Sequence, residues 1–255
     1  MIDAVVIAGG IPGPDEPLYP YTQGQPKALL DIAGKPMAQW VLDALSGSSQ
    51  VRRVIIVGLD ASSGLTCAKP VTFQPSQGGM LENILFGIDQ VLSQDPAAQR
   101  ALLVSSDIPG IRSEMVDWVV TNAAQTDDDL YYHVITQDVM EKRYPGSRRT
   151  YTKLKDAVIC GGDMNVIASR AVTKSREKWV KLIAARKNPL KQAAIIGVDT
   201  LLLMALKALT LDGAVKKVSR RLGLIGRAVL CPYAEVGMDV DKPAQLELMR
   251  ADLEN

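Results

Sequence analysis

The stretch Ala4-Val5-Val6-Ile7-Ala8-Gly9-Gly10, near the start of the chain, decides the predicted fold. Its apolar run of β-branched residues is typical of a buried parallel strand. Glycines directly after such a strand let backbone N–H groups approach phosphate oxygens closely. A loop with several prolines follows and ends in Gln25-Pro26-Lys27, where the lysine can supply positive charge to the same oxygens. The stretch predicts a phosphate-binding loop or, alternatively, a proline-rich surface turn with a solvated lysine.

Further apolar runs extend this pattern along the chain. We expect strands at Val54–Gly58, Leu130–Ile135 and Ala228–Tyr233, a helix through Gln39–Leu45, and mostly helical structure from Ser169 to Gly223. Strands that alternate with helices are typical of a parallel sheet covered on both faces. The sequence therefore predicts a three-layer, Rossmann-like α/β fold with a mostly parallel sheet. A length of 255 residues fits one domain over residues 1–255.

Asp107 ends another predicted strand, which begins at Ala101. A carboxylate at the carboxyl end of a buried strand lies where open α/β sheets bind ligands. Because Mg²⁺ prefers one or two protein carboxylates together with substrate phosphates, Asp107 is a candidate magnesium ligand. Alternatively, it caps the helix predicted over Glu114–Val120, although Ser113 is the better capping candidate.

Gly78 and Gly79 are predicted to begin a helix whose apolar side chains share one face. Asn83 falls on the other side, close to the helix N-terminus. It is either a ligand contact or an exposed residue at a helix start.

Two carboxylates occur in the closing segment Gly237–Leu248. Asp239 and Asp241 point to the same face if this segment is extended. Asp241 could instead cap the last helix, which we expect to begin near Pro243.

Charge is distributed unevenly along the chain. From Lys142 to Arg227 there are 20 Lys and Arg against 5 Asp and Glu, whereas the rest has 9 against 23. This asymmetry predicts an anionic partner for a basic subregion over residues 130–227, with ordinary solvated helix faces as the alternative. In it, Arg148, Arg149 and Lys153 are candidates to hold an acceptor anion, or they belong to a basic edge strand.

The stretch Ala193–Leu206 is apolar on nearly all sides. A buried core helix, a homodimer interface and a membrane-facing helix all remain open for it. Beside basic helices, it raises the possibility of a lipid-linked acceptor or membrane-surface contact, against a soluble phosphorylated acceptor. Nucleic acid is disfavoured as a partner because aromatic residues make up only 5% of the chain.

The motifs together resemble those of the MobA-like NTP transferases, which include sugar-phosphate and cofactor nucleotidyltransferases. Ala4–Gly10, Pro26–Leu30 and Ala33–Met37 are similar to the family's first motif, and Asp107-Ile108-Pro109 to its D-x-P motif. Residues 239–246 resemble its end motif. The family loop usually carries an arginine shortly after the glycines, and none lies between Gly10 and Lys27 here.

The resemblance implies a sheet of the nucleotide-diphospho-sugar transferase type and transfer of NMP from an NTP to a phosphorylated acceptor, with release of pyrophosphate. It implies catalytic roles for Lys27, Asp107 and Asp239, the two aspartates as ligands of Mg²⁺. The nucleotide contacts that it implies are Ala8, Gly9, Gly10, Lys27, Gly79, Asn83 and Ser106, with Gly79 and Asn83 reading the base. Neither the base nor the acceptor is named by the sequence.

Two other functions remain open at this stage. A glycosyltransferase that uses a preformed nucleotide-sugar usually shows Asp-x-Asp at a strand end, and Ser105-Ser106-Asp107 lacks the first Asp. A non-catalytic protein that binds nucleotides or anions is the second. The three widely spaced cysteines and the absence of an apolar leader after Met1 predict a cytoplasmic protein, with membrane association left open.

Overall fold

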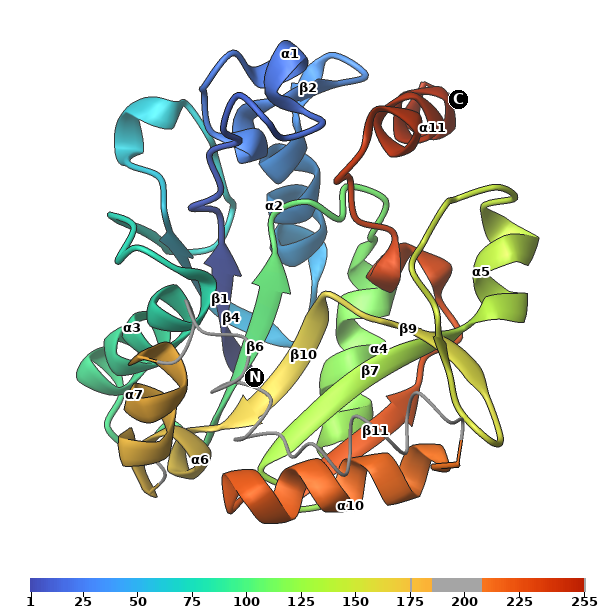
Figure 1. Ribbon diagram of the computed structural model, residues 1–255. Helices are drawn as coiled ribbons and strands as arrows, with labels where there is room; N and C mark the ends of the chain where they lie inside the picture. Colours follow the sequence, from blue (N-terminus) through green and yellow to red (C-terminus); the bar gives the residue numbers. More distant parts are fainter. Residues whose placement is uncertain (175, 185–207, 255) are drawn as a thin grey trace.

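The computed structural model describes residues 1–174, 176–184 and 208–254, and its centre is a nine-stranded sheet (Figure 1). The strand order is β5-β4-β1-β6-β10-β7-β9-β8, and β11 pairs with β7. The strands are β1 Ile2–Ile7, β4 Val51–Val57, β5 Val71–Gln74, β6 Arg100–Ser105, β7 Leu130–Thr136, β8 Thr152–Lys153, β9 Val158–Gly161, β10 Met164–Ala168 and β11 Gly226–Leu230. In this sheet β9 and β10 run against the other strands, so the predicted mostly parallel sheet is confirmed.

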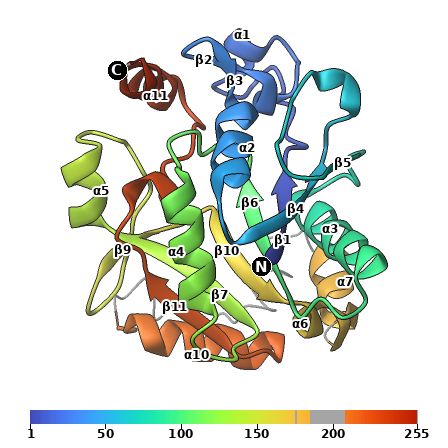
Figure 2. The same cartoon turned by 180° about the vertical axis from the view of Figure 1, so that it is seen from behind.

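Helices cover both faces of the sheet (Figures 1 and 2). On one face lie α2 (Met37–Gly47) and α4 (Ser113–Ala123), which also contact each other. On the other lie α3 (Met80–Gln94), α6 (Ser169–Lys174) and α7 (Arg176–Ala184), while α10 (Leu211–Leu222) packs on β11. The remaining described elements are α1 Tyr19–Thr22, α5 Gln137–Arg143, α11 Pro243–Leu253, a small β2–β3 hairpin (Asp31–Ile32, Lys35–Pro36) and short 3₁₀ turns at Lys27–Leu29, Ala61–Ser63 and Ala234–Gly237.

Alternation along β1 divides the core into two layers. Val6 packs into the cluster that includes α2 and α4, and Val5 packs into the cluster that includes α3. Both side chains are almost completely buried, because successive residues of a strand point to opposite faces of the sheet. The predicted three-layer architecture is therefore confirmed.

Two local predictions were wrong, and one cannot be compared with the structure. Ser113 is the first residue of α4 and Arg112 holds the N-cap position, so Ser113 is not the cap. The alternative of Asp241 as the cap of the last helix is also wrong, because Lys242 holds the N-cap position of α11. The apolar stretch Ala193–Leu206 lies outside the described residues. Among those that the structure describes, no helix is long and apolar enough to cross a membrane.

The buried carboxylate of Asp3 ties β1 to β4. Arg52 donates to it from Nε and Nη2 at 2.9 and 3.0 Å, and Arg53 donates from Nη2 at 2.6 Å. Burial alone would raise the pKa of Asp3, but the bonds from both arginines outweigh burial and lower the pKa. A lowered pKa contributes stability at pH values above the unfolded pKa, and this contribution is lost as the pH falls through the folded pKa.

Asp3→Asn is therefore expected to lower the free energy of unfolding by about 2 kcal/mol at pH 7, because two arginines lose a charged partner. Urea unfolding measures the change. Asp43→Asn, which removes an exposed 2.8 Å pair with Lys35, is the control and should cost less than about 0.5 kcal/mol. Equal losses in the two variants would contradict the role of Asp3.

Candidate active site

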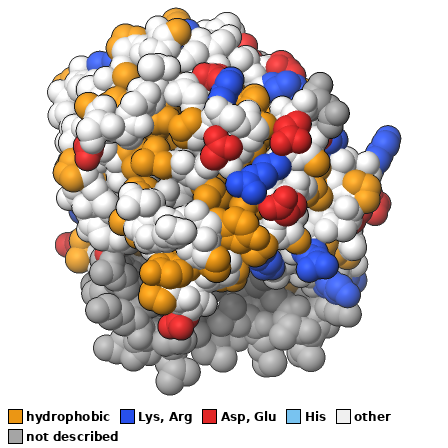
Figure 3. Space-filling view, turned by 90° about the horizontal axis from the view of Figure 1, so that it is seen from above, with side chains coloured by type: hydrophobic (Ala, Val, Ile, Leu, Met, Phe, Trp, Pro, Cys, Tyr) orange, Lys and Arg blue, Asp and Glu red, His pale blue; other side chains and the backbone are white. Residues whose placement is uncertain are grey.

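A cavity of about 430 Å³ opens where β1 and β6 end. It is lined by the glycine loop, the start of α3, the β6 end, the β9–β10 turn and the segment before α11. Figure 3 views this edge of the sheet from above and shows charged side chains of both signs beside hydrophobic ones. The lining residues are Ile7, Gly9, Gly10, Lys27, Ala28, Gly78, Met80, Asn83, Ile84, Leu103, Val104, Ser105, Ser106, Asp107, Asp163, Asn165, Asp239 and Asp241.

Close packing requires glycine at two positions around the glycine loop, Gly9 and Gly58. A Cβ on Gly9 would lie 2.7 Å from the amide nitrogen of Asn83. Gly58 has a φ of +116°, and a Cβ there would lie 2.2 Å from the backbone nitrogen of Gly9. Gly10 accepts a hydrogen bond from the backbone N–H of Lys27 at 2.9 Å, which joins the two ends of the loop. The backbone of Gly9 and Gly10, without side chains, therefore forms this wall of the cavity.

Lys27 reaches across the cavity to two carboxylates. Its Nζ donates to Asp107 at 2.5 Å and to Asp241 at 2.6 Å. Burial would lower the pKa of Lys27, but the two negative charges outweigh burial and raise it. Lys27 is therefore protonated at neutral pH. Ser105 donates from Oγ to the other oxygen of Asp107, so Asp107 bonds within the site and does not cap a helix.

Arg149 forms a second ion-pair group with two carboxylates that line the same cavity. It donates to Asp239 and to the carbonyl oxygen of Gly161, and its Nη2 lies 3.6 Å from Oδ2 of Asp163. Lys27 and Arg149 thus each neutralise carboxylates that come from distant parts of the chain.

Asp163 was not predicted from the sequence. Its Oδ2 is buried without a hydrogen bond. Burial, with the negative charges of Asp107 and Asp241, raises its pKa to about 7 against the opposing effect of Arg149. The available sequence signal was a carboxylate directly after the glycine pair 161–162, between two apolar runs.

Because the folded pKa exceeds the unfolded value, ionised Asp163 destabilises the unliganded protein as the pH rises from about 4 to 7. Asp163→Asn is expected to raise the free energy of unfolding by about 2 kcal/mol at pH 8, roughly half the full linkage value because the other oxygen reaches the cavity. No gain is expected at pH 4. Urea unfolding at both pH values measures this, with Asp43→Asn as control. A gain of equal size at pH 4 would refute the assignment.

The structure brings most of the predicted nucleotide contacts together. Gly9, Gly10 and Ser106 line the cavity, while Ala8 is buried beneath it and Gly79 lies next to the lining residue Gly78. The alternative of an exposed Asn83 was wrong. Asn83 is buried, and its Oδ1 accepts a hydrogen bond from the backbone N–H of Gln77 at 2.7 Å. It therefore fixes the turn that leads into α3.

The structure does not bring the three residues predicted to bind the acceptor together at one site. None of the three lines the cavity itself, but Arg149 bonds to the lining residue Asp239, whereas Arg148 and Lys153 are exposed. Lys153 belongs to β8, the edge strand of the sheet.

The comparisons with known proteins agree with this geometry. The model of the MobA-like NTP transferase domain matches residues 4–224. The chain belongs to this family. The predicted family is thereby confirmed, and a comparison with curated protein sequences gave no match.

Solved structures share the fold of this chain. A hypothetical transferase from Thermus thermophilus is 31% identical, with a TM-score of 0.79, and the match covers 96% of this chain and 100% of that one. A CMP:2-keto-3-deoxy-manno-octonic acid synthetase complexed with CTP is 14% identical, with a TM-score of 0.57 and coverage of 99% and 98%. The 4-diphosphocytidyl-2C-methyl-D-erythritol synthase of Anaerococcus prevotii is 9% identical, with a TM-score of 0.63 and coverage of 100% and 96%.

The chain offsets part of its uneven charge internally. Arginines of the basic subregion pair with acidic residues from the rest of the chain at 2.5 to 2.8 Å. These pairs are Arg143–Asp252, Arg170–Asp127, Arg176–Asp89 and Arg227–Asp128. A polyanionic partner is therefore not needed to balance these four charges.

The donor set of the cavity fits magnesium by chemistry. Asp107, Asp239 and Asp241 line one cavity, and Asp163 contributes a buried carboxylate oxygen with no hydrogen bond. Within residues 1–174, 176–184 and 208–254, no three His, Cys, Asp or Glu side chains form a ready metal-binding group. Two carboxylates together with substrate phosphates are, however, the arrangement that Mg²⁺ prefers.

Proposed function

We propose that this protein transfers a nucleoside monophosphate from an NTP to a phosphorylated acceptor and releases pyrophosphate. An oxygen of the acceptor phosphate attacks the α-phosphorus, and the bond from that phosphorus to the oxygen bridging to the β-phosphate breaks. The observation that supports this most strongly is the convergence of the glycine loop, Lys27, Asp107 and Asp239 on one cavity. Such a reaction needs positioning and charge neutralisation more than covalent catalysis.

Each group has a defined task in this proposal. The N–H groups of Gly9 and Gly10 and the ammonium of Lys27 bind the triphosphate. For this, Lys27 exchanges its bonds to Asp107 and Asp241 for bonds to phosphate oxygens. Asp107 and Asp239 would hold Mg²⁺, which supplies positive charge to the phosphate oxygens. Arg149, released from Asp239, binds the acceptor phosphate, for which its guanidinium has the matching fork geometry.

The base would lie against the start of α3. A volume of about 430 Å³ falls within the range of nucleotide-sized sites. The apolar side chains of Met80, Ile84 and Leu103 border the cavity and offer contact area to a base. One protein of this fold is described as complexed with CTP, which supports a nucleotide in the corresponding place.

A screen of ATP, GTP, CTP and UTP against phosphorylated acceptors, with pyrophosphate detection, tests the proposal. One NTP and one acceptor together should release pyrophosphate, and either alone should not. Pyrophosphate release that does not depend on an acceptor would indicate NTP hydrolysis. Transfer of sugar from a nucleotide-sugar, without pyrophosphate, would indicate a glycosyltransferase. Either result would refute the proposed reaction.

A further inference from the structure

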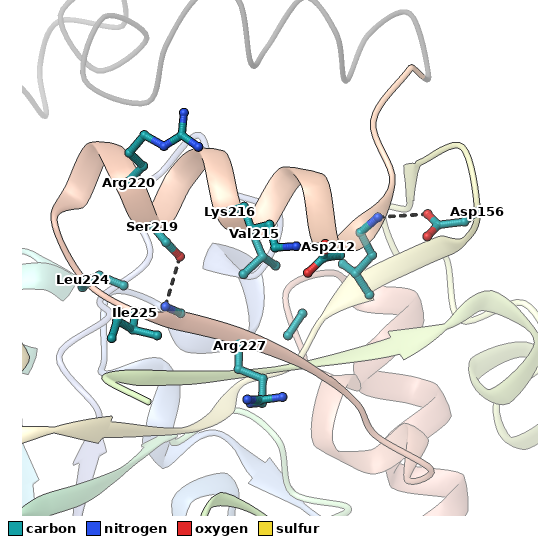
Figure 4. A pocket seen from close by; sticks show the side chains of 12 residues that line it. Asp156, Asp212, Val215, Lys216, Ser219, Arg220, Leu224, Ile225 and Arg227 are labelled. Atoms are coloured by element: carbon teal, nitrogen blue, oxygen red, sulfur yellow. Dashed lines mark hydrogen bonds and ion pairs between the residues drawn. The ribbon is translucent and has the colours of Figure 1, made fainter. Parts of the chain in front are cut away.

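An apolar groove of about 370 Å³ lies between α10 and the sheet. Almost all the surface that lines it is carbon, in contrast to the charged cavity at the strand ends. Figure 4, a close view of an adjoining pocket whose lining includes Asp156, Lys216 and Arg220, shows α10 lying across β11, with Val215 and Ser219 directed toward the strand. The lining residues are Leu130, Tyr132, Val134, Thr152, Leu154, Ile159, Gly161, Leu211, Ala214, Val215, Val218, Ser219, Leu222, Leu224, Gly226, Arg227 and Ala228.

The sheet carries this groove and the candidate active site on one continuous face. Leu103 of β6 pairs with Asn165 of β10, and both line the active-site cavity. Val166 of β10 pairs with Tyr131 of β7, and continuing this antiparallel register by one residue places Asn165 opposite Tyr132, which in turn pairs with Ala228 of β11. Paired residues of neighbouring strands point to the same side of a sheet. This row of paired residues therefore runs from the proposed nucleotide site, at Leu103 and Asn165, to the groove, at Tyr132 and Ala228.

Tyr132 stands at the junction of the two sites. The residue is 44% exposed, and it lines the groove, to which it offers its apolar ring. A Cβ on Gly161 would lie 2.2 Å from its hydroxyl oxygen, so the absence of a side chain there makes room for the tyrosine. The carbonyl of the same Gly161 accepts a hydrogen bond from Arg149 at 3.3 Å. The polar end of the groove thus adjoins the proposed acceptor-phosphate site.

We propose that the acceptor is a phosphorylated amphiphile, with its phosphate at Arg149 and its apolar chain along Tyr132 in the groove between β7 and α10. This rests on the proposed nucleotidyl transfer. A polyhydroxylated acceptor would leave the apolar lining without a partner, whereas an alkyl or isoprenoid chain would remove that surface from water.

A series of alkyl phosphates tests the acceptor class without requiring turnover. Inorganic phosphate, butyl phosphate, hexyl phosphate and octyl phosphate are titrated calorimetrically below their micellar concentrations. Each methylene that enters the groove should tighten binding about fourfold, since a buried CH₂ contributes about 0.8 kcal/mol. Equal affinity for butyl and octyl phosphate would overturn the proposal.

Substitutions in the groove test whether the alkyl chain of the ligand binds there. Val218→Asp places a carboxylate in the groove, and Val218→Phe fills it without adding charge. Both should abolish the dependence on chain length. Val180→Asp is the matched control, since Val180 is an exposed valine of α7 outside the groove. Unchanged chain-length dependence in both groove variants would place the binding site elsewhere.

Pyrophosphate release separates this inference from the proposed reaction. Binding that depends on chain length, without pyrophosphate release, would support the amphiphile site and refute the proposed nucleotidyl transfer. Release with a short sugar phosphate as efficient as with octyl phosphate would confirm the transfer and refute the amphiphilic acceptor.

Discussion

Asp107→Asn is expected to lower kcat for nucleotidyl transfer by about 10³-fold, since it removes one of the two carboxylates that would hold Mg²⁺ against the phosphate oxygens. Asp107 follows β6, lines the cavity and accepts hydrogen bonds from Lys27 and Ser105. The isosteric amide keeps its volume and one acceptor oxygen. Pyrophosphate release under saturating substrates measures kcat.

Asp239→Asn should have an effect of similar size, because Asp239 faces the same cavity from the opposite end of the chain. The control is Asp43→Asn, an exposed carboxylate of α2 whose removal should leave kcat within about twofold of the wild type. Circular dichroism should show each variant folded. A folded Asp107→Asn protein with wild-type kcat would show that Asp107 has no catalytic role.

Lys27→Met is expected to raise KM for the NTP by about 100-fold, since one charged hydrogen-bonding group to phosphate contributes roughly 1.5–3 kcal/mol. No arginine lies between Gly10 and Lys27 that could replace it. The methionine keeps the apolar stem. Steady-state kinetics with varied NTP measures KM, and Lys35→Met, which removes an exposed lysine, is the control.

The same variant has a second expected result. Without Lys27, Asp107 and Asp241 lose the cation that each bonds in the unliganded protein. Binding of Mg²⁺ in the absence of nucleotide should therefore become tighter, by about tenfold for a charge effect of this size. Calorimetry with MgCl₂ measures it. Weaker Mg²⁺ binding, together with an unchanged KM for the NTP, would contradict the place assigned to Lys27.

The sequence predicted the layers of the fold correctly, whereas several strand ends differ by two or three residues, as in β6, which ends at Ser105 and not at Asp107, and β11, which spans Gly226–Leu230. β1 and β6 each contain a continuous apolar run, Ala4–Ile7 and Ala101–Val104, and the glycines and Asp107 follow these strands within a few residues. In such segments the apolar sequence pattern is enough to locate the site, because a buried parallel strand must be apolar and ligands bind at its carboxyl end. Both signals lie within a few consecutive residues.

Side-chain contacts between residues far apart in the chain could not be predicted from local sequence patterns. The bond from Lys27 to Asp241 spans 214 positions, and the one from Arg149 to Asp239 spans 90. Arg148 and Arg149 are neighbours of the same type, yet only the second bonds to Asp239. Asn83 was placed opposite the apolar face of its helix, but the first turn of α3 packs on the glycine loop and buries it.

The fate of the α-phosphorus tests the central claim most directly. The protein is incubated with [α-³²P]NTP, MgCl₂ and the acceptor identified by the screen, and the products are separated by chromatography. The account predicts that label enters the acceptor product in a 1:1 ratio with released pyrophosphate. Label that remains in NTP, or appears only as free nucleotide, would contradict it.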